Sequence, residues 1–159
     1  MFIVRKYTII APVSISIALF ITGCNESKIV QCKRLISAVN QGNSLIENNK
    51  GLQVTTSLKL SQDLENVTKS IQNLRLSDPE LQTYQTNFVK VFDQLSQAIS
   101  TAGKALGATK NAEASNAGRK KIHSARKDIE TTLTSVAQTA GKESDNFGNQ
   151  LNQYCNQTQ

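Results

Sequence analysis

The spacing of the apolar residues is the feature that most constrains this chain. Between residues 27 and 157 they recur at steps of three and four, and no stretch alternates for long as a half-buried strand would. The clearest example is the set Leu60, Leu64, Val67, Ile71 and Leu74, whose steps are four, three, four and three. Such positions share one face of an α-helix. The sequence therefore predicts an all-α domain.

Capping and turn residues divide this region into separate helices. Asn48-Asn49-Lys50-Gly51 supplies a stop, because Asn and Gly accept the left-handed conformation that ends many helices. Ser77 and Glu80 have the spacing of a capping box, and Pro79 suits a first helical turn. The predicted helices span about residues 29–48, 55–76, 79–106 and 112–155.

The last predicted helix is the longest. Asn111 is a candidate N-cap for it, and Gly141 and Gly148 predict a bend or break near 141–148. Four amphipathic helices with short connections favour an up-down-up-down four-helix bundle. In that topology the two ends of the domain meet at one end of the bundle.

The N-terminal residues have the parts of a secretory signal. Residues 1–8 carry Arg5 and Lys6 without an acid, an apolar run follows, and small residues precede Cys24. Only 17 residues separate Lys6 from Cys24, against the ~20 that span a bilayer as a helix. We therefore expect residues 1–23 to be a signal peptide, with an uncleaved anchor as an alternative.

The end of this segment, Ile21-Thr22-Gly23-Cys24, resembles the lipobox of bacterial lipoproteins. The resemblance implies that Cys24 receives a diacylglyceryl thioether and becomes the acylated first residue. Residues 24–28 would then be a lipid-anchored linker and residues 29–157 the helical domain, exported and membrane-anchored in the cell envelope. Asn25 replaces the Asp of an inner-membrane retention signal, which favours the outer membrane. The alternative is an ordinary secretory signal with a chance cysteine.

Two further cysteines, Cys32 and Cys155, lie near the two ends of the predicted domain. An even pair in an exported chain favours a disulfide, and the up-down topology would bring the pair together. Two free, partly buried thiols are the alternative. No CxxC motif occurs, so a thioredoxin-like site finds no support.

Catalytic and metal chemistry have few candidate residues. His123 is the only histidine, and Lys120 stands where a Glu-x-x-His metal motif needs its glutamate. Helical spacing places His123 beside Arg119, Arg126 and Lys127, so we predict a surface histidine. The alternative is that His123 serves as a ligand or as a pH-sensitive contact. No acylation serine motif, P-loop or dinucleotide fingerprint occurs. We therefore predict no catalytic residue, no cofactor and no metal site.

Positive charge is concentrated late in the chain. The segment from residue 101 to residue 127 contains seven basic residues and one acidic residue, Glu113. Its local net charge is therefore +6 (seven minus one). Such a segment attracts acidic proteins or anionic polymers, and a solubilising helix face is the alternative. Nucleic acid is not expected, because an exported chain with few aromatics offers little base stacking. The candidate interaction surface is Arg119, Lys120, Lys121, Arg126 and Lys127.

Three segments resemble small cyanobacterial lipoproteins with all-helical domains: Cys32-Lys33-Arg34-Leu35-Ile36, residues 74–85 (LRLSDPELQTYQ), and Tyr154-Cys155. The resemblance implies a membrane-tethered bundle and supplies no catalytic residue. We expect a non-enzymatic lipoprotein whose bundle has a protein-interaction or structural role. A small-ligand or cation carrier using the bundle core is the alternative, and an envelope hydrolase is the weakest candidate.

Overall fold

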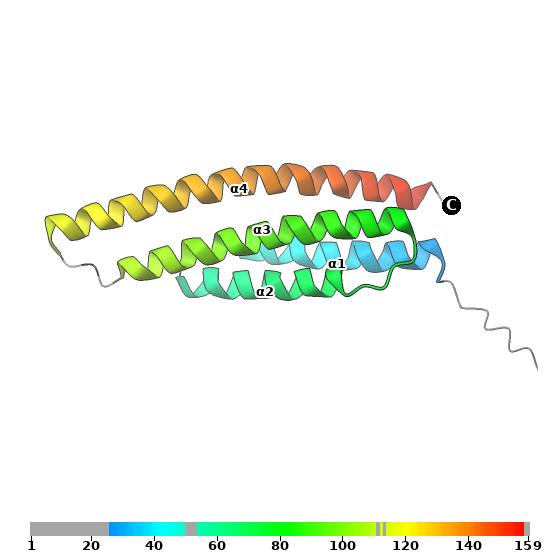
Figure 1. The fold of residues 1–159 in the computed structure, drawn as a ribbon, viewed down its shortest axis with the longest axis horizontal. Helices are drawn as coiled ribbons and strands as arrows, with labels where there is room; N and C mark the ends of the chain where they lie inside the picture. Colours follow the sequence, from blue (N-terminus) through cyan, green and yellow to red (C-terminus); the bar gives the residue numbers. More distant parts are fainter. Residues whose placement is uncertain (1–25, 50–53, 111, 113, 158–159) are drawn as a thin grey trace, which may run out of the picture.

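The structure is a computed structural model that describes residues 26–49, 54–110, 112 and 114–157. These residues form four helices and no strand, and successive helices run in opposite directions (Figure 1). The predicted all-α, up-down-up-down bundle is confirmed. The helices are α1 (Lys28–Asn48), α2 (Val54–Gln72), α3 (Pro79–Thr109) and α4 (Asn116–Asn156).

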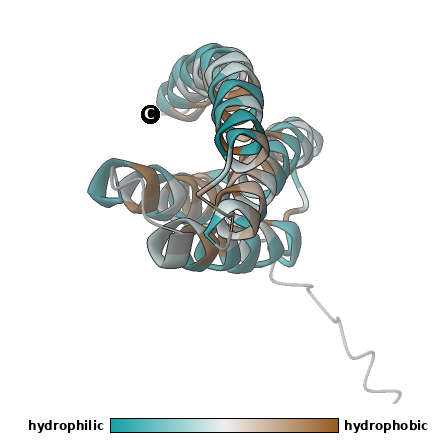
Figure 2. Cartoon of the chain, turned by 90° about the vertical axis from the view of Figure 1, so that its left-hand side faces the viewer, coloured by the Kyte–Doolittle hydropathy of each residue, from teal (hydrophilic) through white to brown (hydrophobic). Residues whose placement is uncertain are grey.

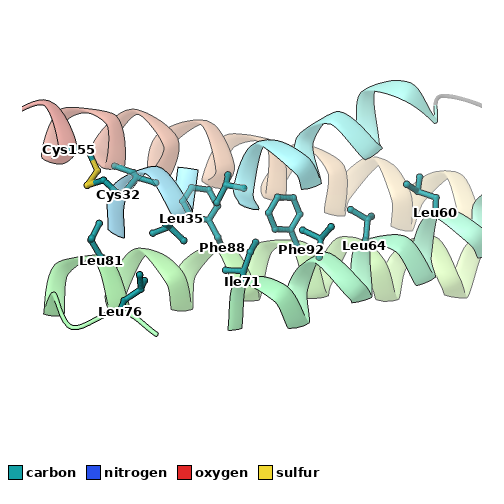
Figure 3. Close-up of a cluster of buried hydrophobic side chains, with 13 residues drawn as sticks. Cys32, Leu35, Leu60, Leu64, Ile71, Leu76, Leu81, Phe88, Phe92 and Cys155 are labelled. Atoms are coloured by element: carbon teal, nitrogen blue, oxygen red, sulfur yellow. A yellow bond between two sulfur atoms is a disulfide. The ribbon is translucent and has the colours of Figure 1, made fainter. Parts of the chain in front are cut away.

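The core lies where α1, α2 and α3 meet, and two stacked phenylalanines occupy its centre (Figure 3). Phe88 and Phe92 have no exposed surface, and their ring centroids lie 6.5 Å apart. The predicted α2 stripe is buried against them, apart from its last member, Leu74, which is half-buried beyond the end of the helix. Burial of these apolar side chains is the main force that holds the helices together.

Helix α2 ends at Gln72, about four residues earlier than predicted. The amide of Gln85 on α3 explains the early end, because its Nε2 donates to the carbonyls of Ile71 and Leu74 at 2.6 and 2.9 Å. These bonds satisfy carbonyl groups that the end of a helix leaves without partners. Leu76 remains buried in the connection although it is not helical.

The predicted capping box before α3 is wrong in its residues. Asp78, not Ser77, is the N-cap, and its Oδ1 accepts from the backbone N–H groups of Glu80 and Leu81 at 3.0 Å each. The backbone N–H of Ser77 instead donates to Oε1 of Gln31 on α1 at 2.7 Å. Ser77 is therefore bound to α1 and does not cap α3, whose cap is the next residue, Asp78.

Helix α4 is continuous from Asn116 to Asn156, so of the bend or break predicted near 141–148 the break is wrong. A Cβ atom at Gly141 or Gly148 would meet nothing within 4 Å, and a glycine inside a helix costs only ~1 kcal/mol. Buried Ala140 and Leu151 anchor the helix before and after this stretch. The helix also begins later than predicted, at Asn116, where Oγ of Ser115 accepts from the N–H of Gly118 at 3.0 Å.

The first half of α4 is only partly covered by the rest of the bundle. Helices α3 and α4 extend beyond α1 and α2 at the end away from the C-terminus (Figure 1), and the end-on view leaves α4 open on one side (Figure 2). Within the described ranges α4 packs along α3 and touches α1, but it makes no close backbone approach to α2. Its apolar stripe between Ile122 and Val136 is consequently half-buried.

Candidate functional site

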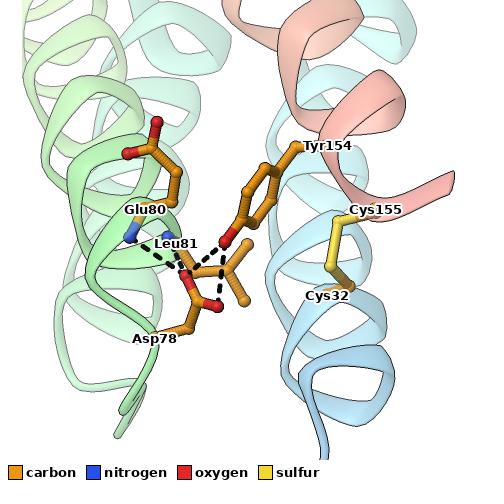
Figure 4. The surroundings of a disulfide bond; sticks show 6 residues. All are labelled: Cys32, Asp78, Glu80, Leu81, Tyr154 and Cys155. Carbon is orange, nitrogen blue, oxygen red and sulfur yellow. Dashed lines mark hydrogen bonds between the residues drawn. A yellow bond between two sulfur atoms is a disulfide. The ribbon is translucent and has the colours of Figure 1, made fainter. Parts of the chain in front are cut away.

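A disulfide between Cys32 and Cys155 joins the start of α1 to the end of α4 (Figure 4). The two Cα atoms lie 5.9 Å apart, although the residues are separated by 123 positions in the sequence. The predicted pairing is confirmed, and the alternating topology explains it, because α1 begins and α4 ends at the same end of the bundle. The predicted lipidation site, Cys24, lies outside the described residues.

Tyr154 forms a polar link beside the disulfide. Its hydroxyl lies 3.0 Å from both carboxylate oxygens of Asp78 and donates to this group (Figure 4). The same carboxylate caps α3, and the ammonium group of Lys28 lies 3.3 Å from the centroid of the Tyr154 ring. One tyrosine thus connects the ends of α1, α3 and α4. In the sequence, Tyr154 follows Leu151 and Phe147 at helical spacing, which indicates packing but not that its hydroxyl would meet a helix cap.

The environment of Tyr154 raises its pKa to about 12, first through burial and then through the hydrogen bond and negative charge of Asp78. The folded protein therefore keeps this proton more firmly than the unfolded chain, whose tyrosine ionises near 10. The resulting stabilisation is complete below about pH 10 and is lost as the pH rises from about 10 to about 12.

We expect Tyr154→Phe to lower the free energy of unfolding at neutral pH by about 1–2 kcal/mol, because a hydrogen bond to a charged group is lost. The variant should also lose the ionisation near pH 12 that we expect of Tyr154 in the folded wild-type protein, which tyrosinate absorbance can follow. Tyr84→Phe is the control, since Tyr84 packs beside Tyr154 with 6.0 Å between ring centroids. Burial and the charge of Glu80 also raise the pKa of Tyr84, so Tyr84→Phe gives the decisive reading: a Tyr154 that ionises near pH 10 in that variant would contradict this assignment.

The five residues of the predicted basic surface are all exposed on the first part of α4. At 100° per residue, Arg119 and Arg126 share one direction, Lys120 and Lys127 share a neighbouring one, and Lys121 points to the opposite side. None of the five has an ion-pair partner among the described residues. The fold therefore gathers four of the five charges over one half of the helix. His123 is exposed on the same part of α4, as predicted.

An open groove runs beside this basic surface, between α4 and the ends of α1 and α2. Its largest cavity, about 570 Å³, is bordered by Ser57 of α2, Leu106 of α3, and Arg126 and Ile129 of α4. A second cavity of about 300 Å³ continues it and adds aliphatic side chains of all four helices. The side chains common to both cavities are Ser57, Ala102 and Leu133.

The groove was not predicted from the sequence, because the apolar residues from Ile122 to Val136 have the spacing of ordinary core packing. A signal for it was present in the predicted lengths: the last helix was expected to be about twice as long as either of the first two. Two short helices cannot cover the whole apolar stripe of a long one, so part of that stripe had to remain accessible.

The structure thus defines a disulfide-linked, all-α bundle with an open groove on one side. No group of side chains suited to a metal ion occurs in the described part of the chain. None of the described helices is long and apolar enough to cross a membrane. Comparisons with protein-family models, curated proteins and solved structures each find no match.

Proposed function

We propose that this chain is an exported lipoprotein, anchored through Cys24, whose bundle is a non-enzymatic docking domain for another envelope protein. The disulfide supports export, because such bonds persist in oxidising compartments. The basic start, apolar run and Ile21-Thr22-Gly23-Cys24 ending support lipidation.

The groove beside α4 carries the docking proposal. Over its two cavities the lining is mostly aliphatic, while Arg126 and Glu130 border it and Lys127 follows on the exposed side of the helix. An amphipathic helix fits this combination, since its apolar stripe can enter the groove at i, i+3 and i+4 positions. Acidic residues along the edge of that helix would meet the basic surface. An anionic polymer would use the charges but not the aliphatic lining, so we favour an acidic amphipathic helix of a protein.

The anchor is tested by growing cells with a labelled fatty acid. Wild-type protein is expected to incorporate the label and to sediment with membranes. Cys24→Ala is expected to lose the label and to accumulate as a larger precursor, because the residue that is modified before cleavage is missing. Cys32→Ser is the matched control and should keep the label. Equal labelling of Cys24→Ala and wild type would contradict lipidation.

The docking surface is tested by placing a photo-crosslinking residue at Leu133 in the full-length protein in its native envelope. We expect crosslinks that map to an acidic, amphipathic helix of one partner. Exposed charges interact through water and are screened over ~8–10 Å at physiological salt. The crosslinks should therefore weaken as salt rises. Exposed ion pairs contribute ~0.2–1 kcal/mol each, so removing the five charges should weaken capture on the order of tenfold or more. The test variant replaces Arg119, Lys120, Lys121, Arg126 and Lys127 with Gln.

The control replaces three exposed lysines elsewhere on the bundle, Lys69, Lys90 and Lys142, with Gln. This control variant should keep its crosslinks, and both variants should retain wild-type helical content and melting temperature. Capture that is unchanged by the loss of the five charges, at low and at high salt, would assign those charges to solubility. Crosslinks to lipid or polymer alone would contradict docking of a protein helix.

A further inference from the structure

Two aliphatic side chains at the start of α1 stand out by their exposure. Ile29 is 42% exposed and Val30 is 43% exposed, and they are the only large hydrophobic side chains in the exposed class among the described residues. Isolated exposed aliphatics are common on protein surfaces. These two are adjacent, however, and they lie at the end of the bundle where the predicted lipid anchor enters.

The helix turns both side chains outward together with a lysine. At 100° per residue, Lys33 lies between Ile29 and Val30 in direction, whereas Cys32 and Leu35 point into the bundle. Lys33 is exposed as well. Surfaces that lie in a membrane interface typically combine apolar side chains with a lysine. The apolar side chains enter the lipid, and the ammonium group of the lysine reaches back to the headgroups.

The chain length outside the helix places this turn close to the expected lipid. Cys24 precedes Ile29 by five residues, which span at most ~17 Å when fully extended. Acyl chains attached to Cys24 would therefore hold the first turn of α1 within reach of the bilayer surface. The inference below rests on the lipidation proposed above.

We infer that Ile29, Val30 and Lys33 form a second membrane contact, in which the two aliphatic side chains enter the lipid interface beside the anchor. Charge at this end of the bundle is nearly balanced, so apolar burial rather than attraction to anionic lipids drives the contact. The basic groups at this end are Lys28, Lys33, Arg34 and Arg75, and the acidic groups are Glu26, Asp78 and Glu80.

The contact would separate the two functional ends of the molecule. Arg119 precedes Cys155 by 36 residues of continuous helix, which is about 54 Å at 1.5 Å per residue. Electrostatic screening acts over ~8–10 Å at physiological salt. A bundle that rests on the first turn of α1 therefore presents its basic surface beyond the field of the lipids, to partners in the surrounding space.

The absence of tryptophan from the sequence allows a direct test. Val30→Trp introduces one fluorophore at the contact, and Ser37→Trp places one seven residues later on the same exposed side of α1. Both proteins are purified in lipidated form and reconstituted into neutral vesicles that contain brominated lipids. We expect a blue-shifted emission and strong quenching for Val30→Trp, with bromines near the headgroups quenching best, and little quenching for Ser37→Trp.

A second measurement uses the unaltered protein. Acetylation of Lys33 by an amine-reactive reagent should be slower in the vesicle-bound lipoprotein than in soluble protein that starts after Cys24, whereas acetylation of exposed Lys120 should not change. Unquenched Val30→Trp in labelled, vesicle-bound protein would overturn the second contact while leaving lipidation intact. Equal quenching at both positions would also overturn it, because α1 would then lie flat on the bilayer. Loss of the fatty-acid label would instead contradict the anchor itself.

Discussion

Replacing both Cys32 and Cys155 with serine is expected to lower the free energy of unfolding by about 2–5 kcal/mol. The disulfide closes a loop with a sequence separation of 123, so its removal frees a long segment of the unfolded chain. The effect should be concentrated in α4, which has few other buried residues: Gly118, Ala140 and Leu151. Chemical denaturation measures the loss, and hydrogen exchange should quicken more in the last turns of α4 than in α2.

Reduction of the wild-type protein provides the matched comparison. Reduced wild type and the double-serine variant should unfold at the same denaturant concentration, and reductant should not affect the variant. A loss below about 1 kcal/mol, measured without reductant, would mean that the disulfide does little to hold α4 against α1.

Gly42→Ala is expected to destabilise the protein by about 1–3 kcal/mol, as overpacking of a filled core typically does. Gly42 of α1 packs against Phe92 of α3, and a Cβ atom there would lie 2.5 Å from Cζ and 2.7 Å from Cε1 of that ring. The Phe92 ring is fully buried beside Phe88, so the extra methyl group could be accommodated only if the ring shifts. This steric cost should exceed the gain of up to ~1 kcal/mol that alanine brings inside a helix. Thermal or chemical unfolding measures the difference.

Gly141→Ala and Gly148→Ala are the matched controls on α4. No atom lies within 4 Å of a Cβ at either position, so each substitution should stabilise the protein by about 0.5–1 kcal/mol. Combining Gly42→Ala with Phe92→Leu should recover part of the loss, because the smaller side chain removes the clash. Equal effects of alanine at positions 42 and 141 would show that the core around Phe92 is loosely packed.

The helices could be predicted from the sequence because their signal is local. Amphipathic spacing, as at Leu60, Leu64 and Val67, reports which side of a helix is buried before its partner is known. Helix ends were less predictable. Gln85 of α3 closes the end of α2, and Gln31 of α1 binds the backbone beside the α3 cap. Both side-chain amides belong to other helices, so the residues around each helix end in the sequence do not indicate these bonds.

The candidate functional residues likewise divide into those evident from the sequence and those evident only from the fold. The cluster of positive charges between Arg119 and Lys127 was evident from the sequence, and the exposure of these side chains follows from the cost of burying unpaired charge. Their position beside an apolar groove was not evident, because it depends on how far α1 and α2 extend along α4 (Figure 1). Tyr154 likewise had the spacing of a packing residue, while its bond to Asp78 joins positions 76 residues apart.

By itself, the sequence determined the all-α class, the number of helices and the alternating order that brings Cys32 to Cys155. Each of these follows from short-range periodicity and chain connectivity. Only the tertiary structure decided which cap begins α3, that α4 continues through Gly141 and Gly148, and that part of its apolar stripe lies open. Those outcomes depend on the packing of helices that are distant in sequence, and packing selects among local alternatives whose energies differ by only about 1 kcal/mol.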